Sequence, residues 1–159
     1  MTENTKSLTN LQTALAMEMT AVHQYLLHAH VLEDWGLDRL ATKMREEMQE
    51  ELGHAGRFID RILFLNGDPK VAQEHPPKKA KSLKDMFEAD LAEEKKAIRF
   101  YTEASNAAAA ESDIGTRQIF ESIVMDEEGH MSWLELQLDL LERMGEPAYI
   151  SRHMSVDNG

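Results

Sequence analysis

The sequence predicts an all-α fold: a four-helix bundle with one long crossover connection and a short C-terminal fifth helix. Residues that break helices are sparse, with 8 Gly and 4 Pro among 159 residues. Between the breaks, apolar residues recur every three or four positions, which is the period of one helix face. The one long irregular stretch, residues 68–81, lies mid-chain and contains three of the four prolines. The chain length of 159 residues fits a single domain over residues 1–159.

The first half of the chain predicts a helical hairpin. A first helix is expected over about residues 7–35, and it ends at Gly36. A second helix is expected from Asp38 to Leu65. It is followed by Asn66 and Gly67, a pair suited to a left-handed C-cap. The turn between the two helices is short, so they should pack antiparallel.

The second half predicts another hairpin of the same kind. Ser82 to Asp85 resembles a capping box, with Asp in place of the usual Glu, and opens a helix to about Glu111. A fourth helix should run from near Asp113 to Gly145. Pro147 is expected to stop it before a short helix over residues 148–154. The connection over residues 68–81 is long enough to cross the bundle.

Composition and charge exclude several function classes. The chain has no Cys, which excludes thiol catalysis, iron–sulfur clusters and cysteine-based zinc sites. Its 29 acidic and 17 basic residues give a net charge of -12, which disfavours nucleic acid and attracts cations. The longest uncharged stretch, residues 19–32, is too short to span a membrane. The N-terminus is polar and unlike a signal peptide, so a cytoplasmic protein is expected.

Six polar residues interrupt the apolar stripes of the four predicted helices. A buried carboxylate without a partner costs several kcal/mol, so these positions need a partner that offsets the cost. The six are Glu18 on the first helix, Glu51 and His54 on the second, Glu94 on the third, and Glu127 and His130 on the fourth.

The spacing of these residues reveals an internal repeat. Glu18 precedes Glu51 by 33 residues, and Glu94 precedes Glu127 by the same interval. A shift of 76 residues superimposes the first hairpin on the second, and it also relates Tyr25 to Tyr101. Two hairpins related in this way bring all six polar side chains to one level at the bundle centre.

The residue types indicate a metal site. Glu-x-x-His places a carboxylate and an imidazole on adjacent turns of one helix face. Four carboxylates and two imidazoles suit two divalent ions, iron or manganese. Two such ions balance four carboxylates, which makes the burial of these groups tolerable.

The sequence resembles the bacterioferritin family over nearly its whole length. The resemblance rests on the segments around Glu18 and Tyr25, on Glu51-Leu-Gly-His54, on residues 61–65, and on Asp126-Glu-Glu-Gly-His130 with the following Trp133. It implies a ferritin-like di-iron bundle with ferroxidase and iron-storage activity. Two iron ions per subunit would be oxidised by O2 or H2O2, and 24 subunits would form a hollow shell.

The resemblance also implies a role for each candidate residue. Glu51 and Glu127 correspond to bridging carboxylates, Glu18 and Glu94 to terminal carboxylates, and His54 and His130 to terminal imidazoles. Tyr25 and Trp133 correspond to neighbours of the centre that could transfer electrons. An ordinary packing role is equally compatible with Tyr25 and is favoured for Trp133.

Haem b is doubtful for this chain. The family binds haem between two subunits through a methionine from each, and Leu52 occupies that position here. Met48 lies one turn earlier and is a weak alternative ligand; a surface or interface role is favoured for it. A second, haem-binding subunit type could join the shell. The histidines outside the motif (His23, His28, His30, His75 and His153) are interpreted as solvated or interface residues.

Two other function classes remain open at this point. One is a di-metal peroxide-scavenging enzyme similar to rubrerythrin or manganese catalase, although rubrerythrins usually carry a four-cysteine iron domain that this chain lacks. The other is a structural bundle without metal, which leaves the six polar residues unexplained.

Overall fold

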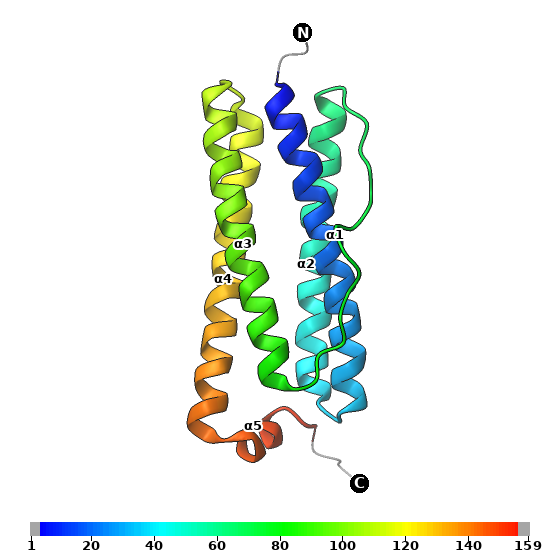
Figure 1. Cartoon of the computed structure of the whole chain (residues 1–159), viewed down its shortest axis with the longest axis vertical. Coiled ribbons are helices and arrows are strands. Elements are labelled where there is room, and N and C mark those ends of the chain that lie inside the picture. Colours follow the sequence, from blue (N-terminus) through cyan, green and yellow to red (C-terminus); the bar gives the residue numbers. More distant parts are fainter. Residues whose placement is uncertain (1–3, 156–159) are drawn as a thin grey trace.

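The computed structural model describes residues 4–155 and folds them into five helices (Figure 1). Their order along the chain is α1 (Thr5–Asp34), α2 (Asp38–Phe64), α3 (Leu83–Ala110), α4 (Ile114–Met144) and α5 (Glu146–Arg152). The four long helices begin and end within two residues of the predicted positions.

The bundle consists of two antiparallel hairpins, α1 with α2 and α3 with α4. The segment between α2 and α3 runs back along the length of the bundle beside α1, as Figure 1 shows. This crossover lets α3 start at the same end of the bundle as α2. The predicted four-helix bundle with one long crossover is therefore confirmed.

Local chemistry explains where the helices begin and end. The Ser82 hydroxyl accepts a hydrogen bond from the Asp85 backbone N–H, and the Asp113 carboxylate caps α4 through the Thr116 N–H. Asn66 has a φ of 61°, the left-handed conformation expected after α2. Gly145, with a φ of 79°, ends α4 as predicted, whereas Pro147 lies in the first turn of α5 and does not itself stop α4.

The apolar core is divided into two clusters with the polar layer between them. One cluster lies near α5 and includes Leu32, Met44 and Phe87. The other includes Leu15, Phe58 and Phe120. Each cluster fixes one end of the bundle, so the buried polar side chains between them are held by packing on both sides. Among the described residues, no helix combines the length and apolar character needed to cross a membrane.

Candidate metal centre

The six predicted residues meet at one level of the bundle, with one each from α1 and α3 and two each from α2 and α4. All six are buried, with between 2% and 6% of their surface exposed. They form two overlapping groups of four whose ligand atoms all lie within 4.8 Å of one another. The first group is Glu18, Glu51, His54 and Glu127, and the second is Glu51, Glu94, Glu127 and His130.

Glu51 and Glu127 lie between the two histidines. Glu51 directs Oε2 to His54 Nδ1 at 3.5 Å and Oε1 to His130 Nδ1 at 3.2 Å. Glu127 directs Oε1 to His54 at 3.2 Å and Oε2 to His130 at 3.5 Å. Each carboxylate thus turns one oxygen to each side, which is the orientation of a ligand that bridges two ions.

Glu18 and Glu94 each belong to one side only. Glu18 Oε1 lies 3.7 Å from His54 Nδ1, and Glu94 Oε1 lies 3.6 Å from His130 Nδ1. The site therefore has two positions with the same composition: one terminal carboxylate, one imidazole and a share of two central carboxylates.

The donor atoms in this cluster lack hydrogen-bond partners, so the residues fit a metal pair. Each of the six residues has one buried atom without a partner: Glu18 Oε2, Glu51 Oε1, His54 Nδ1, Glu94 Oε2, Glu127 Oε1 and His130 Nδ1. Buried polar atoms are normally satisfied, so six unpartnered atoms at one level indicate a site suited to metal ions. Oxygen-rich ligands with two imidazoles suit divalent iron or manganese.

The carboxyl groups of the centre share protons when no metal is bound. Burial and the adjoining Glu127 together raise the pKa of Glu94 to about 9, although the contact with His130 opposes the shift. Burial and the Glu18 charge also raise the pKa of Glu51. Burial would raise the pKa of Glu127 as well, but its contacts with Glu94, His130 and His54 lower it.

Both imidazoles of the centre are basic. Burial by itself would lower the pKa values of His54 and His130, but carboxylate contacts, with Glu127 the strongest in each case, outweigh burial and raise both. In the absence of metal the cluster therefore balances its charge with protons, which a binding cation would have to displace.

Two buried tyrosines orient the terminal carboxylates. The Tyr25 hydroxyl donates to Glu94 Oε1 at 2.9 Å, and the Tyr101 hydroxyl donates to Glu18 Oε1 at 2.7 Å. Each bond leaves Oε2 as the unpartnered oxygen. The sequence analysis did not predict this role for Tyr101, although the 76-residue shift that relates Tyr101 to Tyr25 could have indicated it. Trp133 packs edge-on against Phe87, with the ring centroids 5.9 Å apart.

Acidic residues support the outer edges of the two histidines. His54 Nε2 lies 2.9 Å from Asp126 Oδ2, and His130 Nε2 lies 2.7 Å from Glu50 Oε2. Such contacts fix the ring orientation and leave Nδ1 free to face the metal. These two acids were not predicted, although the 76-residue shift relates Glu50 to Asp126.

The interpretation of His28 as a solvated or interface residue was wrong. It is 2% exposed, and its Nε2 lies 2.9 Å from Asp90 Oδ1 in a buried pair. Burial raises the pKa of Asp90, whereas the His28 contact opposes that shift. The partner that makes this burial possible lies on α3, 62 residues away, so the local sequence held no signal for it.

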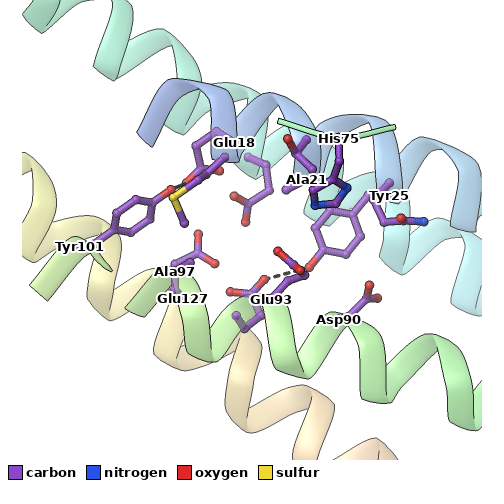
Figure 2. A pocket seen from close by; sticks show the side chains of 14 residues that line it. Glu18, Ala21, Tyr25, His75, Asp90, Glu93, Ala97, Tyr101 and Glu127 are labelled. Atoms are coloured by element: carbon purple, nitrogen blue, oxygen red, sulfur yellow. Dashed lines mark hydrogen bonds between the residues drawn. The ribbon is translucent and has the colours of Figure 1, made fainter. Parts of the chain in front are cut away.

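A cavity of about 60 Å³ adjoins the centre between α1 and α3. Its lining includes all four carboxylates of the cluster, together with both tyrosines, Asp90 and Glu93. Figure 2 shows His75, from the crossover, beside Ala21 and Tyr25 at this cavity. A small ion or gas molecule that enters here meets the terminal carboxylates.

Comparison with known proteins agrees with this geometry. Residues 8–144 match the model of the ferritin-like domain. The chain is 44% identical to the bacterioferritin of Rhodobacter capsulatus over 135 residues, which cover 85% of this chain and 84% of that protein. The chain belongs to the bacterioferritin family. It is also 42% identical to the bacterioferritin of Brucella melitensis, over 91% of this chain and 89% of that protein.

Solved structures of bacterioferritins have the same fold. The Rhodobacter capsulatus bacterioferritin, described with a metal-free dinuclear site and haem iron in a crystallographic special position, matches with a TM-score of 0.95 and 39% identity. That match covers 100% of this chain and 99% of the other. The Mycobacterium tuberculosis bacterioferritin matches with a TM-score of 0.93 and 34% identity, over 98% of each chain. Membership of this family supports iron storage, and the buried cluster fits a di-iron site.

Proposed function

We propose that this protein is an iron store that oxidises Fe(II) at an intra-subunit di-iron centre and deposits Fe(III) as a mineral inside a hollow shell. The observation that carries the proposal is the set of six unpartnered, buried donor atoms, divided into two positions that share Glu51 and Glu127. No arrangement of protein hydrogen bonds explains why a bundle would bury these atoms unsatisfied.

The residues of this chain bind and orient two Fe(II) ions as substrates. Glu18 and His54 would hold one ion and Glu94 and His130 the other. Oxidation removes one electron from each ion, so two Fe(II), one O2 and two protons yield two Fe(III) and one H2O2. With H2O2 as the acceptor, two Fe(II) and two protons yield two Fe(III) and two water molecules.

The charge of the chain favours the entry of Fe(II) ions into the centre. The net charge of -12 attracts cations, and the cavity between α1 and α3 leads to the ligand carboxylates. The buried tyrosines hold Glu18 and Glu94 with one oxygen each, so the other oxygen can accept an incoming ion without a large rearrangement.

Storage requires a shell, and we place this single domain in a cytoplasmic particle of 24 subunits. Family membership supports the assembly, and large apolar side chains such as Phe64, Ile114 and Met125 are more than two-thirds exposed on the isolated chain. Such side chains are typical of surfaces that pack against another subunit.

The native mass of the particle, measured together with its iron content, tests the storage function. After Fe(II) is added in air, light scattering should report a particle of about 24 chains, and elemental analysis should find far more than two iron ions per chain. Monomers or dimers at micromolar protein would refute storage and leave only oxidation.

The peroxidase or manganese catalase alternative is not favoured. The relatives are named bacterioferritins or bacterial ferritins, and the chain lacks the cysteines of a rubrerythrin iron domain. Manganese that stays bound and catalyses loss of H2O2, without accumulation of iron, would reverse this preference.

A further inference from the structure

The internal repeat allows the two metal positions to be compared residue by residue. The shift of 76 residues relates His54 to His130 and Glu50 to Asp126. The two acids have equivalent roles, because each contacts the outer nitrogen of the histidine in the other hairpin. Their side chains are also alike in exposure, at 41% for Glu50 and 43% for Asp126. Glu50 and Asp126 therefore give the histidines of the two metal positions outer contacts of the same kind.

Glu47 has no such counterpart. Its Oε2 pairs with His130 Nε2 at 2.6 Å, and its side chain is 6% exposed. The shift of 76 residues relates Glu47 to Ile123, a fully buried apolar residue. The outer edge of His130 therefore contacts a buried carboxylate as well as a half-exposed one. The outer edge of His54 contacts the half-exposed Asp126, and the half-exposed Glu50 lies within 4.8 Å.

A neighbouring cation holds Glu47 in place and offsets its charge only in part. Lys43 Nζ lies 2.9 Å from Glu47 Oε1, the oxygen that does not face His130. The Lys43 side chain is 33% exposed, so solvent screens its charge more than that of Glu47. Lys43 also has an apolar counterpart, Ile119, so the whole acid–base pair is confined to one half of the centre.

A carboxylate on the outer edge of a ligating imidazole strengthens the ligand. It stabilises the N–H at Nε2 and increases the electron density that Nδ1 offers to a cation. Because Glu47 is buried, this effect acts at low dielectric and adds to that of Glu50. Among the described residues, the acids near the corresponding edge of His54, Asp126 and Glu50, are both half-exposed.

We infer that Glu47 makes the two metal positions unequal, so that the first divalent ion binds at the Glu94/His130 position and the second at the Glu18/His54 position. Glu47 acts through His130 and is a positioning residue. The inference rests on the di-metal centre proposed above. It implies that one Fe(II) is held in readiness, and that filling the weaker position starts the two-electron oxidation.

Crystals of the unmodified protein with one Co(II) added per chain test the order of filling directly. Anomalous scattering at the cobalt edge should give an occupancy at the Glu94/His130 position about tenfold or more above that at the other position, the scale on which supporting contacts change metal affinity. Equal occupancies, or a preference for His54, would overturn the inference. Absence of Co(II) from both positions would contradict the proposed centre itself.

Substitution of Glu47 then tests the cause of the inequality. Glu47→Gln keeps the shape of the side chain but removes its charge, and Glu46→Gln removes the same charge from the neighbouring exposed residue. In Co(II) titrations followed by visible absorption, the Glu47 variant should lose about tenfold or more in the first binding step and leave the second step nearly unchanged. The Glu46 variant should match the unmodified protein. Equal effects of the two substitutions would remove Glu47 as the cause.

Discussion

At the residue scale, the centre buries polar atoms that no hydrogen bond within the protein satisfies. Four buried carboxylates and two imidazoles lie within contact distance, and each has an atom that no protein group satisfies. Burial of such a group without a partner costs several kcal/mol. The ligands should therefore contribute little to the stability of the protein without metal, although they are essential to metal binding.

Removal of one ligand should separate activity from folding. Glu127→Ala or Glu94→Ala is expected to slow Fe(II) oxidation by about tenfold or more, since even supporting contacts of a metal site have effects of that size. The melting temperature of the Glu94 variant without metal should fall little or rise, because a buried acid with an unpartnered oxygen has been removed. Oxidation followed by absorbance and thermal melts followed by circular dichroism measure the two effects.

Glu128→Ala is the matched control for Glu127→Ala. Glu128 is adjacent in the chain but exposed, so its loss should leave the oxidation rate unchanged. Unchanged rates in both ligand variants would mean that these residues do not form the centre.

The raised pKa values predict how pH changes the stability of the protein without metal. The pKa of Glu94 is about 9 in the folded chain and near 4.5 when unfolded, so the folded state binds more protons between these values. The raised pKa values of both histidines act in the same direction above pH 6.5. Stability should therefore fall as pH rises from about 5 to 9.

Thermal melts of chelator-treated protein at pH 6, 7, 8 and 9 measure this slope. Bound Co(II) should flatten it, because the cation replaces the protons. Glu94→Gln, whose neutral amide mimics the protonated acid, should remove part of the slope. A melting temperature that rises over this range would contradict the assigned protonation.

At the element scale, each hairpin places its ligands by packing long helices on both sides of the polar layer. The start of α4 is fixed to α2 by the Asp113 carboxylate, which accepts hydrogen bonds from Arg61 Nη2 at 2.6 Å and from the Thr116 backbone N–H at 3.2 Å. Asp113 is almost completely buried, so it combines a helix cap with a shielded ion pair.

Asp113→Ala should therefore destabilise the protein by about 2 kcal/mol, because it removes a cap and leaves Arg61 without its partner. That corresponds to a fall in melting temperature of about 4–8 °C for a domain of this size. Asp139→Ala breaks only an exposed pair with Arg143 and should lower the melting temperature by less than about 2 °C. Equal shifts in the two variants would contradict the structural role of Asp113.

The sequence predicted most of the fold and the clustering of the six polar residues, because both follow from periodicity and repetition. The six ligands repeat between hairpins, and so do Tyr25 with Tyr101 and Glu50 with Asp126. What escaped prediction does not repeat. The 76-residue shift relates Glu47 to Ile123, and it relates His28 and Asp90 to two alanines, Ala104 and Ala14. Only the three-dimensional arrangement shows which partners make these groups tolerable inside the bundle.

At the scale of the whole molecule, the outer surface of α2 determines whether the protein can offer a ligand to haem. Leu52 is 45% exposed, which confirms the prediction that it points away from the ligand cluster. Met48 is half-buried and packs against the core cluster near α5, so it is poorly placed to serve as an external ligand. Leucine has no donor atom for iron.

We therefore expect the assembled protein to purify without stoichiometric haem, even when haem is supplied. Leu52→Met, a nearly volume-conserving change that costs less than about 1.5 kcal/mol, should restore some binding. The visible absorption spectra of the two proteins after haem addition measure the difference. A low-spin spectrum of bis-methionine ligation in the unmodified protein would contradict the role of Leu52 and direct attention to Met48.

The central claim is that each chain oxidises iron at one centre with two positions, and stopped-flow absorbance tests it most directly. Fe(II) is mixed with the protein in oxygenated buffer at ratios from below one to several ions per chain. We expect a fast oxidation phase whose amplitude grows until two Fe(II) per chain and then stays constant, while further iron is oxidised more slowly. A fast phase that saturates at one ion per chain, never saturates, or is absent would contradict the two-position centre.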